Sequence, residues 1–234
     1  MSEDPFTAKY LAGQVLLVDK PLEWTSFDVV KKIRGTLRIK KIGHAGTLDP
    51  LATGLLILCT GKMTKQIETY QGQEKEYTGT LVLGKTTPSL DLETEFDSGV
   101  STDHLTPTDV ETVRERFIGA QQQIPPHYSA IRVDGKRAYK DAHKGKTVKM
   151  EPRLVDITEL EFTRIEIPEV DFRVVCSKGT YIRALARDIG EAVGVGAHLS
   201  ALRRTRIGDQ KIEDALPLAD WVTQLKEEHA NTRG

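Results

Sequence analysis

The chain has 234 residues, of which 38% are hydrophobic and 29% charged, and its formal net charge at pH 7 is −1. This length and composition are typical of a soluble globular protein with one sizeable core. No apolar run approaches the roughly 20 residues of a membrane helix, and the N-terminus MSEDPFTAKY lacks the charged start and apolar centre of a signal peptide, so we expect a cytoplasmic protein.

The first 60 residues predict a strand, a helix and a second strand. Residues 14–20, QVLLVDK, form a short apolar run that ends before Pro21, as a strand followed by a turn would. Thr25 and Asp28 fit a capping box at a helix start. Apolar residues then recur at helical spacing, at Phe27, Val30, Ile33 and Leu37. The run LLILCT, 55–60, is apolar throughout, which predicts a fully buried strand.

The middle of the chain mixes the two patterns. A helical stripe follows at Met63, Ile67 and Tyr70. Residues 75–84 alternate as a strand does, with one face made of Tyr77, Gly79, Leu81 and Leu83. The acidic stretch from 85 to about 104 is interpreted as a surface excursion with little core of its own.

The second half is predicted to contain two further helices and several strands. Residues 106–119 predict a helix with Val110, Val113 and Phe117 on its apolar face. Residues 123–135 predict a proline turn, a strand and an Asp-Gly turn, and 136–145 a basic helix. Residues 153–179 alternate as two paired strands, and a helix then starts at Thr180 as N-cap and ends at Gly194. This mixture without a βαβ rhythm predicts an α+β fold on a mixed, mostly antiparallel sheet.

Two cysteines and six histidines give little support for a metal. Cys59 and Cys176 lie in separate apolar runs, which favours buried free thiols. The histidines show no His-x-x-x-His spacing and the cysteines no Cys-x-x-Cys spacing, so we predict no metal site.

Positive charge gathers in three segments, 31–44, 132–153 and 203–206. Such segments could follow a phosphate backbone, although charge runs are commonly no more than solvated faces. Composition alone leaves both interpretations open.

Two residues raise a functional question on local chemistry. Asp49 lies in HAGTLDPLATG, 44–54, where Asp-Pro could open a turn or a short helix that Gly54 ends. The same segment lies between a basic run and a buried strand, where loops commonly carry chemistry. Arg183 falls in the first turn of a predicted helix, where the macrodipole disfavours a cation, so it is either an ordinary surface arginine or the partner of a carboxylate.

Four other positions have both a structural and a functional interpretation. Tyr77 and Tyr181 open a strand and a helix, and each ring either completes a core or stacks on an unpaired base. His44 is either a loop histidine or a contact to a ligand, and Lys20, before Pro21, is on local grounds a solvated turn residue.

Five blocks of the sequence, in order from about residue 14 to 216, resemble the motifs of the TruB family of tRNA pseudouridine synthases. They are LLVDKPLEWTSFDVV, HAGTLDPLATGLLILCTGKMTK, KEYTGTLVLG, QIPPHYSAIRVDGKRAY and CSKGTYIRALARDIGEAVGVGAHLSALRRTRIG. Several spaced blocks in order are more specific than one short pattern. The resemblance implies a pseudouridine synthase fold with its catalytic cleft at the sheet rim, and the isomerisation of uridine 55 in the tRNA T-loop.

The resemblance also implies roles for individual residues. Asp49 would be the catalytic carboxylate and Arg183 its salt-bridge partner. Tyr77 would stack on the target uracil, with Tyr181 and Leu202 lining its pocket. His44 would contact the RNA loop where the base has left the stack, and Lys20 would support the N-terminal motif near the site.

The chemistry of the implied reaction agrees with these residue types. The bond between C1′ and N1 breaks, the uracil turns, and C1′ joins C5, without redox change, so no cofactor is expected. An ionised carboxylate can act as a nucleophile on C1′ or C6, or as a base on a sugar proton, and the sequence leaves these alternatives open. A base held in a folded loop must be flipped out, which gives the aromatic positions a purpose.

The length after residue 216 leads to further expectations. It leaves no room for the C-terminal PUA domain of longer relatives, so we expect one catalytic domain over 1–234 that acts as a monomer, without guide RNA. Two rival hypotheses are a non-catalytic tRNA-binding protein or folding chaperone, and a metabolic enzyme on free nucleosides.

Overall fold

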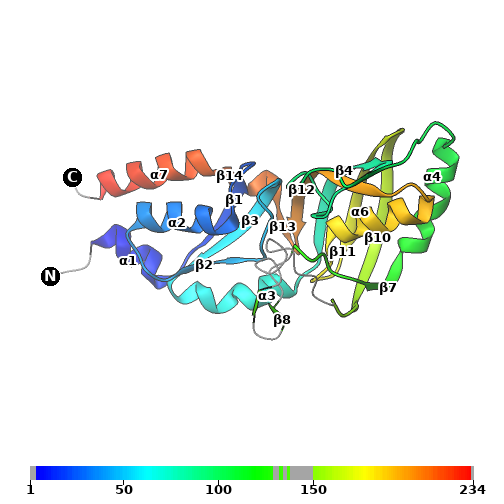
Figure 1. Cartoon of the computed structure of the whole chain (residues 1–234). Helices are drawn as coiled ribbons and strands as arrows, with labels where there is room; N and C mark the ends of the chain where they lie inside the picture. The colour runs from blue at the N-terminus through cyan, green and yellow to red at the C-terminus, as the bar shows by residue number, and fades with distance from the viewer. Residues whose placement is uncertain (1–3, 129–131, 134–135, 138–149, 233–234) are drawn as a thin grey trace. The chain divides into compact units, whose positions relative to one another are not determined.

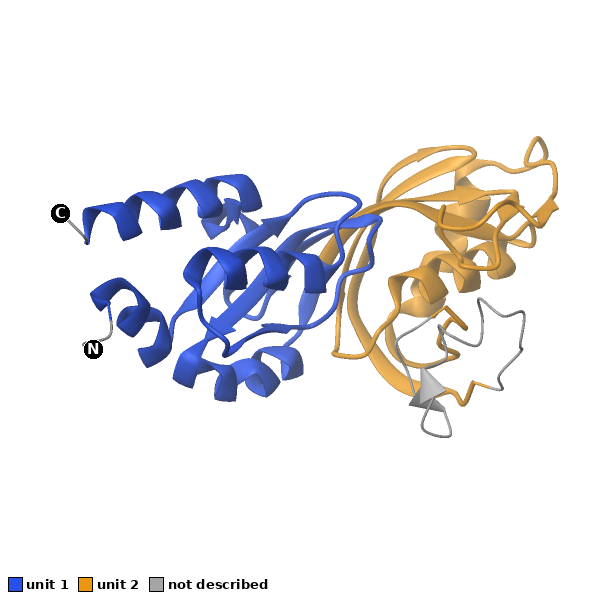
Figure 2. Ribbon diagram, turned by 60° about the vertical axis from the view of Figure 1, so that its left-hand side comes forward, with its two compact units in different colours: residues 1–76, 203–234 blue, residues 77–202 orange. Residues whose placement is uncertain are grey.

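The computed structural model describes residues 4–128, 132–133, 136–137 and 150–232 (Figure 1). The chain divides into two compact units, which Figure 2 colours separately: unit 1 comprises residues 1–76 and 203–234, and unit 2 comprises 77–202. Helices and a mixed sheet in one chain confirm the predicted α+β class. Among the described residues, no helix is long and apolar enough to cross a membrane.

Unit 1 is a sheet with helical segments on both faces. Its helical segments are α1 Pro5–Ala12, α2 Ser26–Leu37, η1 Gly61–Gln66, α3 Ile67–Gly72, η3 Ile212–Asp214 and α7 Leu218–Asn231. Its strands are β1 Val15–Lys20, β2 Ile42–Ala45, β3 Ala52–Thr60, β13 Gln210–Lys211 and β14 Leu216–Pro217, with the end of β12, Ala197–Ile207. β1 pairs antiparallel with β3 and parallel with β14, and β2 pairs antiparallel with β3.

Strand β3 separates the two cores of unit 1 because its side chains alternate between the faces of the sheet. Leu56 and Leu58 pack with α1, α2 and α7. Leu55, Ile57 and Cys59 pack on the other side with apolar residues of η1 and α3. The prediction of a fully buried strand at 55–60 is therefore confirmed, as is the stripe formed by Met63, Ile67 and Tyr70.

Helix α2 confirms the predicted capping box and corrects one core residue. The Thr25 side chain accepts a hydrogen bond from the Asp28 amide, and the Asp28 side chain accepts one from Thr25. The buried apolar residues are Val29, Val30, Ile33 and Leu37, whereas Phe27 is 59% exposed. The prediction for Phe27 was wrong because the buried stripe of the helix begins at Ser26 and Val29.

Unit 2 carries the remaining elements. Its strands are β4 Lys75–Leu83 from Tyr77 onward, β5 Lys85–Thr86, β6 Ser98–Gly99, β7 Gly119–Gln123, β8 Arg132–Val133, β9 Lys136–Arg137, β10 Arg153–Glu166 and β11 Glu169–Cys176. Its helical segments are α4 Pro107–Arg114, η2 Glu115–Phe117 and α6 Ile182–Val193. The strands follow the order β4-β11-β10-β7, and β10 and β11 form the predicted antiparallel pair.

Three predictions for unit 2 need comment. The acidic stretch is not wholly a surface excursion, because Thr87, Ser89 and Asp91 are buried. Residues 132–133 and 136–137 pair as a short hairpin, which agrees with a strand but places a strand at the start of the predicted basic helix. The rest of that helix, 138–145, lies outside the described residues.

Candidate active site

Asp49 lies in the loop of residues 46–51 that joins β2 to β3, which we call the Asp49 loop. The Ala52 amide donates a hydrogen bond to the Asp49 carbonyl at 3.1 Å, so residues 49–52 close a β-turn with Pro50 at its second position. The turn interpretation of Asp-Pro is thus confirmed. Gly54 does not end a helix: it lies inside β3 with φ of +102°.

Residues of the turn after β1 and the first residue of α2 form hydrogen bonds with the Asp49 loop. The buried Ser26 hydroxyl accepts from the Leu48 amide at 2.8 Å and donates to the Leu48 carbonyl at 3.1 Å. The Glu23 amide donates to the Pro50 carbonyl at 2.9 Å. These bonds fix the backbone on both sides of Asp49.

Lys20 is a buried part of this arrangement and not the solvated turn residue that local chemistry favoured. Its side chain has no exposed surface. Its Nζ donates to the carbonyls of Pro21 at 2.9 Å, Pro50 at 3.3 Å and Trp24. The ammonium therefore ties the turn after β1 to the residue that follows Asp49.

Arg204 supports the same loop from β12. Its guanidinium is buried and donates from Nε to the Leu55 carbonyl at 2.8 Å and from Nη2 to the Gly46 carbonyl at 3.2 Å. A Cβ on Gly54 would lie 2.3 Å from the Arg204 carbonyl, so only glycine permits this close approach.

The basic segment 203–206 is therefore not a free phosphate-binding face. Arg203 pairs with Asp19 at 2.7 Å and Arg206 with Glu74 at 3.0 Å, while Arg204 is buried. The sequence suggested three exposed cations here because charge patterning does not reveal burial.

The Asp49 loop lies among positive charges. Burial lowers the pKa of Lys20 to about 8, an effect that attraction to Asp49 partly offsets and repulsion from Arg204 strengthens. Burial also lowers the pKa of His44, with a Gly46 backbone hydrogen bond acting in the opposite direction and Arg204 in the same direction. The His44 imidazole is consequently neutral at pH 7, where it can both donate and accept hydrogen bonds.

Arg183 lies in unit 2, in the first turn of α6, and only 4% of its surface is exposed. It is therefore not an ordinary surface arginine. Nη1 donates to the Ser89 carbonyl and Nη2 to the Tyr128 carbonyl, both at 2.8 Å, and Nε lies 3.6 Å from the Asp91 carboxylate. These contacts hold the guanidinium in a fixed orientation.

The start of α6 differs from the predicted cap. Tyr181 is the N-cap residue, and the Thr180 hydroxyl instead donates to the Ser177 carbonyl at 2.9 Å. The Gln123 side chain accepts from the Tyr181 amide at 2.8 Å and donates to its carbonyl at 3.1 Å. Thr180 fails as a cap because its side chain bonds backward into the preceding turn. Gly194 ends the helix in a left-handed conformation, as predicted.

The structure thus distributes the predicted site residues over both units. Lys20, His44 and Asp49 belong to unit 1, and Lys20 and Asp49 interact electrostatically. Unit 2 contains the other four, of which Tyr77 and Arg183 are buried and Tyr181 and Leu202 half-buried. Their roles in catalysis stay predictions.

Sequence reasoning missed three residues that organise these sites: Ser26, Asp91 and Arg204. Ser26 was one residue of the first motif block with no role assigned to it, and Asp91 was one acid among many in the acidic stretch. No local signal distinguishes Arg204 from its neighbours, because its acceptors are backbone carbonyls from distant segments.

Comparison with known families decides the kind of protein. The profile of the TruB family pseudouridylate synthases (N-terminal domain) matches residues 34–182, and that of the tRNA pseudouridylate synthase B C-terminal domain matches residues 183–232. The chain belongs to the TruB family. It is therefore an isomerase of the pseudouridine synthase class, as the motif resemblance implied.

Individual TruB relatives agree with this assignment. The chain is 54% identical to tRNA pseudouridine synthase B of Flavobacterium johnsoniae, over 93% of this chain and 98% of that protein. It is 56% identical to the protein of the same name from Phocaeicola vulgatus, over 91% of this chain and 94% of the relative. Among solved structures, a chain of a Cbf5-Nop10-Gar1 complex matches with a TM-score of 0.71 and 31% identity, over 94% of this chain and 56% of that one.

Proposed function

We propose that this TruB family member converts uridine 55 in the T-loop of tRNA to pseudouridine, with Asp49 as the essential carboxylate. The observation that carries the proposal is the identity of 54% over 98% of the length of a relative named tRNA pseudouridine synthase B. We also expect a cytoplasmic enzyme that works without guide RNA.

The geometry of the Asp49 loop supports the assignment of the carboxylate. A group that must act on one atom of a sugar or base needs a fixed position. Ser26 and Lys20 fix the backbone beside Asp49, and the Lys20 ammonium interacts electrostatically with the Asp49 carboxylate. As an ionised carboxylate, Asp49 would act as nucleophile or as base.

The proposal gives the other predicted residues complementary tasks. The flipped uracil would stack on the Tyr77 ring between Tyr181 and Leu202, and His44 would contact the loop that the base has left. Arg183, whose guanidinium is already fixed by its carbonyl partners, would provide the cation for Asp49.

An assay on an unmodified tRNA transcript tests the proposal. We expect the purified protein to convert uridine 55, and Asp49→Asn to lose conversion by several orders of magnitude while still binding the tRNA, because the amide carries no charge and is neither a base nor a nucleophile of comparable strength. Asp209→Asn, at an exposed position between β12 and β13, is the matched control and should convert at the wild-type rate.

Three results would contradict parts of this proposal. Full conversion by Asp49→Asn would remove Asp49 from its role. Wild-type binding without conversion would favour an RNA chaperone. Conversion of free uridine without RNA would favour the nucleoside enzyme.

A further inference from the structure

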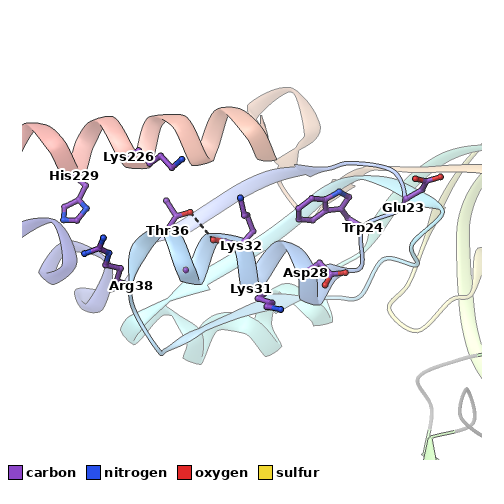
Figure 3. Close-up of a pocket in the computed structure, with 10 residues that line it drawn as sticks. Glu23, Trp24, Asp28, Lys31, Lys32, Thr36, Arg38, Lys226 and His229 are labelled. Carbon is purple, nitrogen blue, oxygen red and sulfur yellow. Dashed lines mark hydrogen bonds between the residues drawn. The ribbon is translucent and has the colours of Figure 1, made fainter.

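A groove of about 700 Å³ runs between α2 and α7 in unit 1 (Figure 3). α7 is fixed against the sheet because the Trp221 Nε1 donates to the Leu17 carbonyl at 2.7 Å, and its apolar side joins the core that contains α2. Side chains of both helices and of the residues that flank α2 line the groove, among them Trp24, Lys31, Lys32, Arg38, Lys226 and His229.

The charge of the groove is positive. Four permanent cations, Lys31, Lys32, Arg38 and Lys226, line it and are exposed, whereas the acids are Glu23 and Asp28. Asp28 accepts hydrogen bonds from Thr25 in the capping box, so part of its bonding capacity is occupied. The ion pairs of the described residues include none of these four cations, although Lys31 interacts electrostatically with Asp28.

Arg38 has a backbone conformation that arginine rarely adopts. It follows the last residue of α2 with φ of +56°, in the left-handed conformation that glycine and asparagine adopt most easily at helix ends. A cation at this end also interacts favourably with the helix dipole, but Arg34 in the last turn already supplies one. Neither the backbone conformation nor the helix dipole therefore accounts for an arginine at this position.

One end of the groove lies near the Asp49 loop, although no residue of that loop lines the groove. Glu23, at one end of the groove, donates its amide to the Pro50 carbonyl, and Ser26 at the start of α2 holds Leu48. From there the 12 residues of α2 extend for about 18 Å to Arg38, at 1.5 Å per residue. An RNA strand that presents its base near Asp49 and continues along α2 would pass several phosphates over these cations.

We propose that the groove between α2 and α7 binds the sugar–phosphate backbone of the substrate tRNA as it leaves the Asp49 loop. The inference rests on the proposed function for the identity of the RNA. Exposed lysines and an arginine recognise phosphates without reading sequence, so the groove adds affinity and direction to binding and takes no part in bond-making.

The test compares three proteins on one unmodified tRNA transcript: the wild type, the triple variant Lys31→Gln/Lys32→Gln/Lys226→Gln, and the charge-preserving triple Lys31→Arg/Lys32→Arg/Lys226→Arg. For the glutamine variant we expect tRNA affinity to fall about tenfold or more at moderate salt. The magnitude of the slope of log affinity against log salt should fall by up to about 2.7, since each of three lost phosphate contacts removes roughly 0.7–0.9. The rate at saturating tRNA should stay within about twofold of wild type, and the arginine variant should bind like the wild type.

Two results would overturn the groove as a phosphate site: an unchanged salt slope in the glutamine variant, or an arginine variant as weak as the glutamine one. Either result would favour a different partner for the groove, such as an acidic protein surface. Failure of the proposed function is distinguishable, because it appears as wild-type protein that converts no uridine, whereas the groove is judged by how tightly the variants bind tRNA and by the salt dependence of that binding.

Discussion

Unit 1 contains two groups of cations with opposite environments. Lys20 and Arg204 are buried and donate to backbone carbonyls around the Asp49 loop. Lys31, Lys32 and Arg38 are exposed along α2. The first group positions the loop, whereas the second group faces solvent. Only the tertiary contacts distinguish the two groups, because the sequence alone does not reveal burial.

The largest effect is expected at Arg204. Arg204→Met leaves the buried Leu55 carbonyl and the partly buried Gly46 carbonyl without this donor and removes packing, so the free energy of unfolding should fall by about 3 kcal/mol. Urea denaturation followed by circular dichroism measures it. A loss below about 1 kcal/mol would show that the buried cation does not organise this region.

Lys20 should give a smaller, pH-dependent effect. Its pKa is about 8 in the folded chain and near 10.5 when unfolded, so between these values the unfolded state binds more protons and the free energy of unfolding rises with pH. Lys20→Met should lack this rise, which we expect to be on the order of 1–2 kcal/mol. Urea titrations of both proteins at pH 7.0 and about pH 10 provide the comparison, and parallel pH curves would refute the buried-ammonium interpretation.

Arg203, the neighbour of Arg204 in β12, tests whether burial explains the large effect expected at Arg204. Its ion pair with Asp19 at 2.7 Å is partly exposed, with 40% of the arginine side chain accessible. Water and salt screen such a pair, so Arg203→Met should reduce the free energy of unfolding by less than about 1 kcal/mol. If this variant were as destabilised as Arg204→Met, burial would not explain the difference between the two positions.

The sequence correctly predicted those features of unit 1 that depend only on residues close together in the chain. The capping box at Thr25 needs only residues three apart, and the buried strand at 55–60 needs only an unbroken apolar run. The burial of Arg204 depends on carbonyls from Gly46 and Leu55, more than 140 positions away, which no spacing rule relates to it.

The candidate site shows the same division. Local chemistry raised Asp49 and Arg183 as candidates, and the motif resemblance gave them roles that stay predictions. The turn at Asp49 was predicted from its proline. The Asp91 carboxylate beside Arg183 was missed because its burial follows from tertiary packing, and the acidic composition around it is typical of an exposed segment.

Substitution of Arg38 should give the smallest change in stability. It should also distinguish most clearly an effect on folding from an effect on tRNA binding. Glycine adopts the φ of +56° without strain, so Arg38→Gly should leave the free energy of unfolding unchanged or raise it by about 0.5 kcal/mol, despite the loss of a cation at the helix end. The same variant should bind tRNA more weakly and with a salt slope reduced by up to about 0.9, because one phosphate contact is lost. Urea denaturation and salt-titrated tRNA binding on one preparation measure both quantities. If the variant lost stability and kept its salt slope, Arg38 would stabilise the fold as Lys20 and Arg204 do. Exposure would then not distinguish Arg38 from the buried cations.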